Sequence, residues 1–152
     1  MDIWVHFTVS ALITVVLWPF FGPISMLVLI GGVLIDVDHY FWNIIRNKNY
    51  SLKKTYQFCK RIERIKDTER YKEAVMIFHT FDALIIMILI SLLFKEFYFI
   101  LLGVVVHLFM DFMQVYVRWG SPYFLAIFKK SSTIFLIRFF QAKVISSKPY
   151  SW

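Results

Sequence analysis

Eight ionisable side chains lie in or at the ends of otherwise apolar segments of this 152-residue chain. They comprise all four histidines and four of the ten carboxylates: His6, Asp36, Asp38, His39, His79, Asp82, His107 and Asp111. Polar groups of this kind are costly in an apolar environment unless they are paired, so these residues are candidates for a functional site. Imidazole and carboxylate ligands without thiolate are typical of zinc, manganese or iron sites, and we expect zinc. The single cysteine, Cys59, excludes a Cys-rich zinc site.

The spacing of these residues places several of them on shared helix faces. His107 and Asp111 are four residues apart. His79 and Asp82 are three apart. Side chains at either spacing lie on the same face of a helix, so each pair can point into the interior of a helical bundle. Several helices that present such pairs together can form a metal site in the core of a bundle.

The segment from Asp36 to His39 leaves two readings open. Asp36 and His39 are three residues apart and share a face, whereas Asp38 would point nearly the opposite way on a regular helix. Either the helix is interrupted after Gly31-Gly32, where glycine weakens it, or one carboxylate lies outside the set of ligands. Of these residues, Asp38 is the less certain ligand.

These residues lie in or beside four apolar runs of the sequence. The runs cover residues 5–21, 24–42, 74–94 and 97–117. The chain is 59% hydrophobic and 20% aromatic, and its mean hydropathy is +0.64, which excludes an ordinary soluble enzyme. Each run approaches the roughly 20 residues that a helix needs to cross a bilayer. Gly22-Pro23 separates the first two runs with a turn. We therefore predict a single-domain, all-α integral membrane protein with four transmembrane helices in two hairpins.

The distribution of basic residues predicts the orientation of this bundle. In a four-span arrangement, 16 of the 17 Lys and Arg residues lie on the side of the 43–73 loop and the termini, and Lys95 alone lies on the other. This asymmetry predicts a multi-pass protein of the cytoplasmic membrane with both termini in the cytoplasm. It also explains the net charge of +7 without a nucleic-acid partner, which we do not expect.

Two segments outside the apolar runs are expected to lie at the membrane surface. In the 43–73 loop, apolar residues recur every three or four positions at Leu52, Tyr56, Cys59, Ile62 and Ile65. This pattern predicts an amphipathic helix on the anionic inner leaflet. The aromatic tail, 118–152, is interrupted by basic residues and is expected to be interfacial as well. Both segments could instead be solvated linkers.

The order of these motifs resembles that of the membrane-bound metal-dependent hydrolase family, a group of small inner-membrane proteins. The matching segments are His6, Leu34-Ile35-Asp36-Val37-Asp38-His39, Phe78-His79-Thr80 and the Gly103 to Asp111 segment with its His-x-x-x-Asp element. Ile35 replaces a proline of the family, and Ala74-Val75-Met76 replaces a His-Arg-Gly segment. If that histidine is a metal ligand in the family, the resemblance implies that this chain has either lost one coordination position or recruited Asp82 in its place. The His-x-x-x-Asp element is also similar to one in zinc-dependent phospholipases C, which favours phosphoester chemistry.

The residues and the resemblance together predict a metal-dependent hydrolase at the cytoplasmic interface. The expected metal ligands are His6, Asp36, His39, His79, His107 and Asp111, and the expected proton relays are Asp38 and Asp82. Metal-activated water would attack a phosphoester or ester of a lipid-like substrate. His6 could instead contact lipid headgroups, and Asp82 could cap its helix. The alternative functions are an ion or proton-coupled transporter and a non-catalytic membrane protein stabilised by metal.

Overall fold

The computed structural model describes residues 3–65 and 77–119, and every regular element in these two ranges is helical. The all-α prediction is therefore confirmed for the described part of the chain. The expected interfacial tail lies outside the described residues from position 120 onward, and so does the 66–76 segment.

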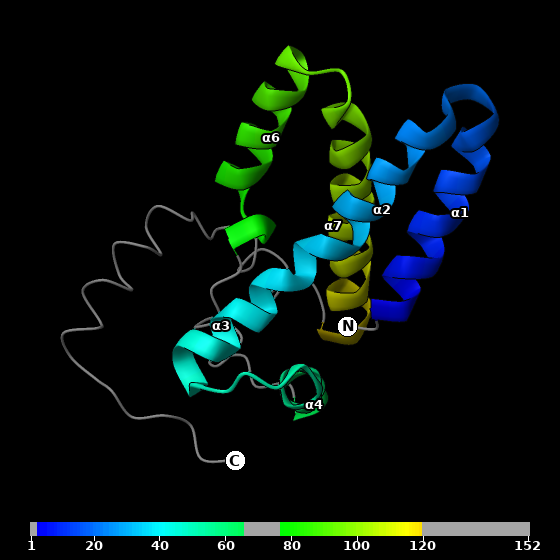
Figure 1. Ribbon diagram of the computed structural model, residues 1–152. Helices are drawn as coiled ribbons and strands as arrows, with labels where there is room; N and C mark the ends of the chain where they lie inside the picture. The colour runs from blue at the N-terminus through cyan, green and yellow to red at the C-terminus, as the bar shows by residue number, and fades with distance from the viewer. Residues whose placement is uncertain (1–2, 66–76, 120–152) are drawn as a thin grey trace.

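Two helical hairpins form the body of the molecule, and both turn at the same end (Figure 1). In chain order their elements are α1 (Ile3–Phe21), η1 (Gly22–Met26), α2 (Leu27–Val33), α6 (Phe81–Leu93) and α7 (Phe97–Trp119). Gly22 has a φ of 59°, a left-handed value that glycine adopts without strain, and Pro23 stands at the start of η1. The turn predicted at Gly22-Pro23 is therefore confirmed.

The third apolar run is helical over a shorter length than predicted. In its described part, a single turn, η3 (Ile77–His79), precedes α6, which begins after Thr80. The Thr80 side chain accepts a hydrogen bond from the Ala83 N–H (3.4 Å) and so caps α6 at its N-terminus. The 13 residues of α6 extend about 20 Å, which is less than the roughly 30 Å of a hydrocarbon core.

The second apolar run is interrupted between its two halves. A short 3₁₀ turn, η2 (Leu34–Asp36), separates α2 from α3 (Val37–Asn47), and Figure 1 shows α3 extending beyond the other helices of the bundle. This is the first of the two readings predicted for the Asp36 to His39 segment. Because the helix is not regular here, Asp36 and Asp38 can both reach the same end of the bundle.

Two glycines let α2 and α7 approach one another closely. A Cβ on Gly31 would overlap the backbone carbonyl of Ile100, and a Cβ on Gly103 would overlap the backbone carbonyl of Val28. Small residues of this kind allow helix backbones to come into direct contact, as in many membrane helix pairs. The contact fixes the position of α7 relative to the segment that carries Asp36.

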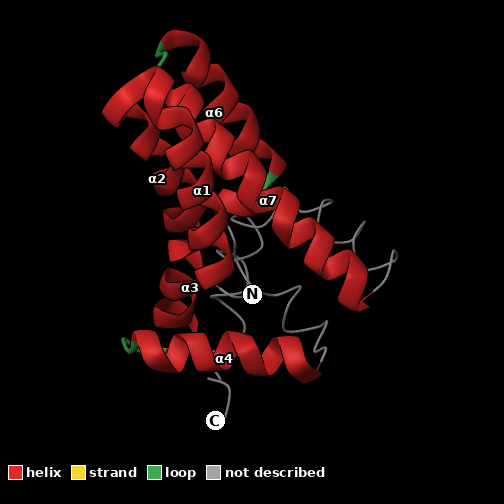
Figure 2. Ribbon diagram, turned by 90° about the vertical axis from the view of Figure 1, so that its right-hand side faces the viewer, coloured by secondary structure: helices red, strands yellow, loops and turns green. Residues whose placement is uncertain are grey.

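A further helix, α4 (Leu52–Ile65), lies across the end of the bundle, roughly perpendicular to α3 (Figure 2). The amphipathic helix predicted in the 43–73 loop is therefore present. Its corner with α3 is held by the Asn43 amide, which donates to Thr55 Oγ1 (2.7 Å) and to the Asn49 carbonyl (3.1 Å). The rings of Trp42 and Phe58 stack across the same corner at 5.7 Å.

The face of α4 that is buried within the protein overlaps only in part with the apolar stripe. Thr55, Phe58 and Ile62 are buried, whereas Leu52 and Tyr56 are exposed. Leu52 and Tyr56 belong to the stripe that was predicted to lie on the membrane surface, and they do not take part in the contact between α4 and α3.

Burial in the described residues is inverted relative to a soluble domain. Only six apolar side chains are buried, whereas 12 polar or charged side chains are buried and 36 large apolar side chains are exposed. By length and composition, two helical stretches could cross a membrane: Ile3–Ile45, which contains the first hairpin, and Phe97–Val117.

Candidate metal centre

The predicted site residues lie at the end of the bundle opposite the two hairpin turns. They come from five separate elements, α1, η2, α3, η3 and α7, together with Asp82 in the first turn of α6. Residues separated by up to 105 positions in the chain, His6 and Asp111, contact one another there. The close contacts among α1, α2 and α7 bring these elements together.

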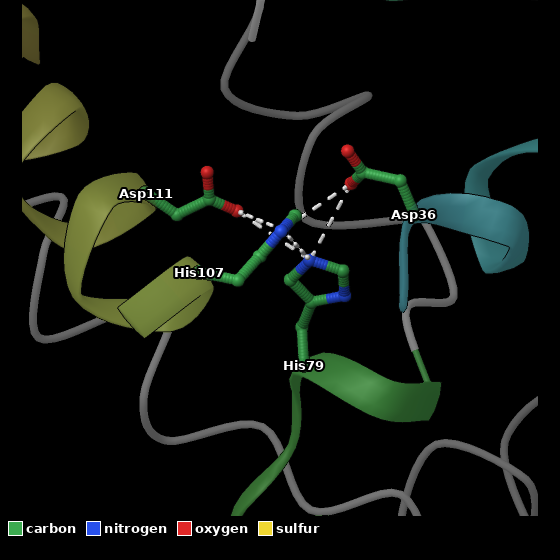
Figure 3. Close-up of side chains that lie close together, drawn as sticks. All are labelled: Asp36, His79, His107 and Asp111. Atoms are coloured by element: carbon green, nitrogen blue, oxygen red, sulfur yellow. Dashed lines mark hydrogen bonds and ion pairs between the residues drawn. The ribbon is translucent and has the colours of Figure 1, made fainter. Parts of the chain in front are cut away.

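Four of the predicted residues bring one ligand atom each to a common point: Asp36, His79, His107 and Asp111 (Figure 3). The two imidazole Nε2 atoms are 3.3 Å apart. Asp36 Oδ1 is 3.7 Å from His79 Nε2 and 3.4 Å from His107 Nε2. Asp111 Oδ2 is 3.4 Å and 3.3 Å from the same two nitrogens. We call these four residues the tetrad.

The spacing of the tetrad's ligand atoms matches a tetrahedral metal site. Atoms at the corners of a tetrahedron, each 2.0–2.1 Å from a zinc ion, are about 3.3–3.4 Å apart. Four of the five distances above are 3.3 or 3.4 Å, and the fifth is 3.7 Å. All four ligand atoms lie within 4.8 Å of one another, so the tetrad could hold a metal ion.

Hydrogen bonds on the far side of each imidazole aim a lone pair at this point. His107 Nδ1 donates to the Gly32 carbonyl (2.8 Å), and His79 Nδ1 donates to Asp38 Oδ2 (2.9 Å). Because the carbonyl and the carboxylate can only accept, both Nδ1 atoms carry a proton, and in the neutral imidazoles both Nε2 atoms have lone pairs. This outer contact is the one that metal-binding histidines make in most proteins. Two lone pairs at 3.3 Å repel one another unless a proton or a cation lies between them.

The electrostatics of the tetrad also favour a cation. With neutral imidazoles the tetrad carries two negative charges, and His107 is fully buried while the other three side chains are 11–14% exposed. Asp36 Oδ1 is buried and has no hydrogen-bond partner. Buried carboxylates are costly unless they are paired or bind a metal, so a divalent cation would balance this charge.

Asp38 and His39 form a second group with His79 beside the tetrad. Besides His79 Nδ1, Asp38 Oδ2 accepts a hydrogen bond from the Phe78 N–H (3.2 Å), which ties η3 to α3. His39 Nε2 is 3.3 Å from Asp36 Oδ1, and His39 Nδ1 is 3.9 Å from the Cys59 sulfur of α4. Asp38 is thus placed against a predicted ligand rather than at the centre of the tetrad.

His6 lies outside both groups of ligand atoms but contacts the tetrad directly. Its Nε2 is 3.1 Å from Asp111 Oδ1, the carboxylate oxygen that does not face the two other imidazoles. Its ring stacks on that of His107, with centroids 4.0 Å apart and planes 22° apart. His6 is 2% exposed, so it is a buried neighbour of the site and not a surface contact with headgroups.

Asp82 is not part of either group of ligand atoms in the described residues. It lies in the first turn of α6, where the side chain of Thr80 provides the N-terminal cap. Among the described residues, Asp82 is thus not one of those whose ligand atoms meet at the tetrad.

Sequence reasoning missed three contacts that build the site. These are the Gly32 carbonyl behind His107, the Thr80 cap before α6 and the Cys59 sulfur beside His39. The position of Thr80 two residues before Asp82 is a recognisable N-terminal signal, because threonine is a favoured cap. No sequence signal identifies a backbone carbonyl as the partner of an imidazole.

Comparison of the chain with protein-family models, with curated proteins and with solved structures gives no match. The described residues form a buried cluster of His and Asp residues that could hold a metal ion, in an all-α protein with long apolar helices.

Proposed function

We propose that this chain is a membrane-embedded, metal-dependent hydrolase of the kind that its motif order resembles. The observation that carries the proposal is the near-tetrahedral arrangement of the four ligand atoms of the tetrad. A divalent ion held there, most simply zinc, would polarise a phosphoryl or carbonyl oxygen and activate water.

The residues around the tetrad would orient its donors. Asp38 and the Gly32 carbonyl hold the two imidazoles in the tautomer that binds metal. His6 lies against the outer oxygen of Asp111 and limits rotation of that carboxylate. Such support matters because ligands must be held within about 0.5 Å of the productive geometry.

The inverted burial supports a position in the membrane. The exposed apolar side chains would face lipid, and the buried hydroxyl, imidazole and carboxylate groups would face the interior of the bundle. The excess of Lys and Arg near the site end favours the cytoplasmic side. Labelling of Cys59 by an impermeant maleimide from outside intact cells would contradict this orientation.

The position of the site favours a lipid-like substrate. The tetrad lies at the end of the bundle that α4 crosses, and α4 carries exposed basic residues such as Lys53 and Lys54. A basic helix at this depth would attract anionic headgroups. An ester or phosphoester of an amphipathic lipid could reach the site from the same level.

Buried polar groups near the other end of the bundle favour hydrolysis over transport. Thr14, Ser25 and Ser91 are buried there, and each hydroxyl donates to a backbone carbonyl three or four residues earlier in the chain. Such locally satisfied hydroxyls do not provide the polar path across the membrane that a proton-coupled carrier requires.

Turnover by the purified protein tests the proposal. Zinc-loaded protein in lipid nanodiscs would be assayed with short-chain phosphatidylglycerol and with p-nitrophenyl phosphate, alongside the variants His107→Ala and Val105→Ala. We expect metal-dependent hydrolysis that is lost in His107→Ala and kept in Val105→Ala, whose side chain lies on the exposed face of the same helix. Wild-type protein that binds zinc but hydrolyses neither substrate class would favour a structural role for the metal.

A further inference from the structure

The tetrad lies well inside the apolar length of α7. His107 is ten residues from either end of the apolar stretch Phe97–Val117, and Asp111 is six residues from its C-terminal end. Because a helix rises about 1.5 Å per residue, roughly 9–15 Å of apolar helix separates these two ligands from Val117. Helical side chains also tilt toward the N-terminus, which moves both ligands further from Val117. The metal centre is therefore nearer the middle of this stretch than its C-terminal end.

Both helices that continue past the tetrad keep an exposed apolar surface there. On α7, Met113 is 42% exposed and Val117 is 75% exposed. On α3, Phe41 is 55% exposed and Ile45 is 59% exposed. In a chain embedded in a membrane, a surface of this kind faces lipid chains, because its contact with water is unfavourable. The apolar layer therefore extends beyond the tetrad toward α4.

Basic residues mark the level at which this layer ends. Past the tetrad, the first Lys or Arg of α3 is Arg46, ten residues after Asp36. The first of α7 is Arg118, seven residues after Asp111. The helix α4, which lies across the end of the bundle (Figure 2), adds exposed basic side chains such as Lys53. Lys and Arg gather near lipid headgroups, so the headgroup level is about 10–15 Å from the tetrad along these helices.

The exposed residues that flank the tetrad in the chain are apolar as well. Val37, Phe78 and Phe109 each lie within two residues of a member of the tetrad and are 36–61% exposed. The tetrad itself is not sealed, because the side chains of Asp111 and Asp36 are 12% and 14% exposed. These surroundings favour an uncharged group that carries apolar chains over a charged group.

Depth separates the two kinds of bond that the proposed function leaves open. The phosphoester of a phospholipid belongs to the charged headgroup, and drawing it into the apolar layer costs the free energy of removing a charge from water. The carboxylic ester is uncharged and lies beneath the headgroup, where it joins the acyl chain. The carboxylic ester is therefore the bond that matches the depth of the tetrad.

We propose that the substrate is a lipid whose carboxylic ester reaches the tetrad from the acyl-chain layer. This inference rests on the proposed function and selects the carboxylic ester over the phosphoester. Hydrolysis joins the oxygen of water to the acyl carbon and breaks the bond between that carbon and the alcohol oxygen. One proton of the water passes to the alcohol oxygen, and the products are a fatty acid and an alcohol.

Nitroxide labels measure the depth without an activity assay. In a Cys59→Ser background, single cysteines from Phe109→Cys, Val117→Cys and Lys53→Cys would be labelled in vesicles of phosphatidylcholine and phosphatidylglycerol. Relaxation of each label by oxygen, which collects in the acyl layer, would be compared with relaxation by a water-soluble nickel chelate. We expect the label at position 109 to be the deepest, the label at 53 to lie at the headgroups and the label at 117 to lie between them. A label at 109 that is as accessible to nickel as the label at 53 would overturn the proposal.

A matched pair of lipids tests the bond itself. Zinc-loaded protein would be given dioleoylphosphatidylglycerol or its diether analogue, which keeps the phosphoester but has no carboxylic ester, and the products would be identified by mass spectrometry. We expect oleic acid and lysophosphatidylglycerol from the first lipid and a complete loss of hydrolysis with the second. Cleavage of the diether would overturn the choice of the carboxylic ester and leave the proposed function intact. If zinc-bound protein hydrolysed neither lipid, both proposals would be refuted.

Discussion

Replacing Gly103 with alanine tests whether the close contact between α2 and α7 sets the geometry of the metal centre. A Cβ at position 103 would overlap the Val28 carbonyl and would lie 2.7 Å from the Gly32 nitrogen, whereas ordinary contacts begin at 3.4 Å. The two backbones must therefore separate by at least about 0.7 Å, since a packed interior offers no free space to absorb the difference. The same glycine, Gly32, accepts the 2.8 Å hydrogen bond from His107. That bond would lengthen to about 3.5 Å, where it is effectively lost.

The expected effect is a weaker metal site in a less stable protein. Disturbing a contact behind a metal ligand usually costs about 10- to 100-fold in metal affinity, and overpacking costs about 1–3 kcal/mol of stability. Zinc affinity would be measured by competition with a chromophoric chelator, and stability by thermal unfolding in detergent. Val105→Ala is the matched control, because it changes an exposed side chain on the same helix. If Gly103→Ala bound zinc as tightly as Val105→Ala and unfolded at the same temperature, the helices could not be in this contact.

Three further predictions concern the surroundings of the tetrad. Thr80→Ala should lower the free energy of unfolding by about 1 kcal/mol in thermal denaturation, because α6 loses its cap, whereas Thr80→Ser should retain most of it. Asp38→Asn should weaken zinc binding about tenfold or more, because an amide is a poorer acceptor for His79 Nδ1, and an unchanged affinity would contradict that role. Zinc affinity should fall as the pH is lowered, because protons compete for the two Nε2 lone pairs. A chelator titration that is independent of pH between about 8 and about 6 would exclude imidazole ligands.

The sequence was sufficient to single out the four residues that meet in the tetrad. Ionisable groups are rare in apolar helices, so His79, His107 and Asp111 stand out by type alone. Their places near the ends of antiparallel helices then predict a single cluster. The same reasoning predicted the turn at Gly22-Pro23, since both residues have strong local conformational preferences.

The different role of each of these residues could not be predicted in the same way. Asp36 belongs to the tetrad and Asp38 contacts His79 because η2 interrupts the helix. The helical periodicity of the sequence does not predict a short 3₁₀ turn of this kind. The buried face of α4 depends on the contact between Trp42 and Phe58, which is a matter of tertiary packing and not of local spacing. Asp82 matched the helical pattern, but the cap at Thr80 sets where α6 begins and Asp82 is not brought to the tetrad.

X-ray absorption at the zinc edge, recorded on purified protein that holds one equivalent of zinc, reports directly on the ligands of the tetrad. We predict nitrogen and oxygen ligands at about 2.0–2.1 Å, scattering from imidazole rings and no sulfur. In His107→Ala this four-coordinate signal should disappear, whereas Val105→Ala should reproduce the wild-type spectrum. Sulfur in the coordination shell, or a spectrum that His107→Ala does not change, would contradict a metal centre built from Asp36, His79, His107 and Asp111.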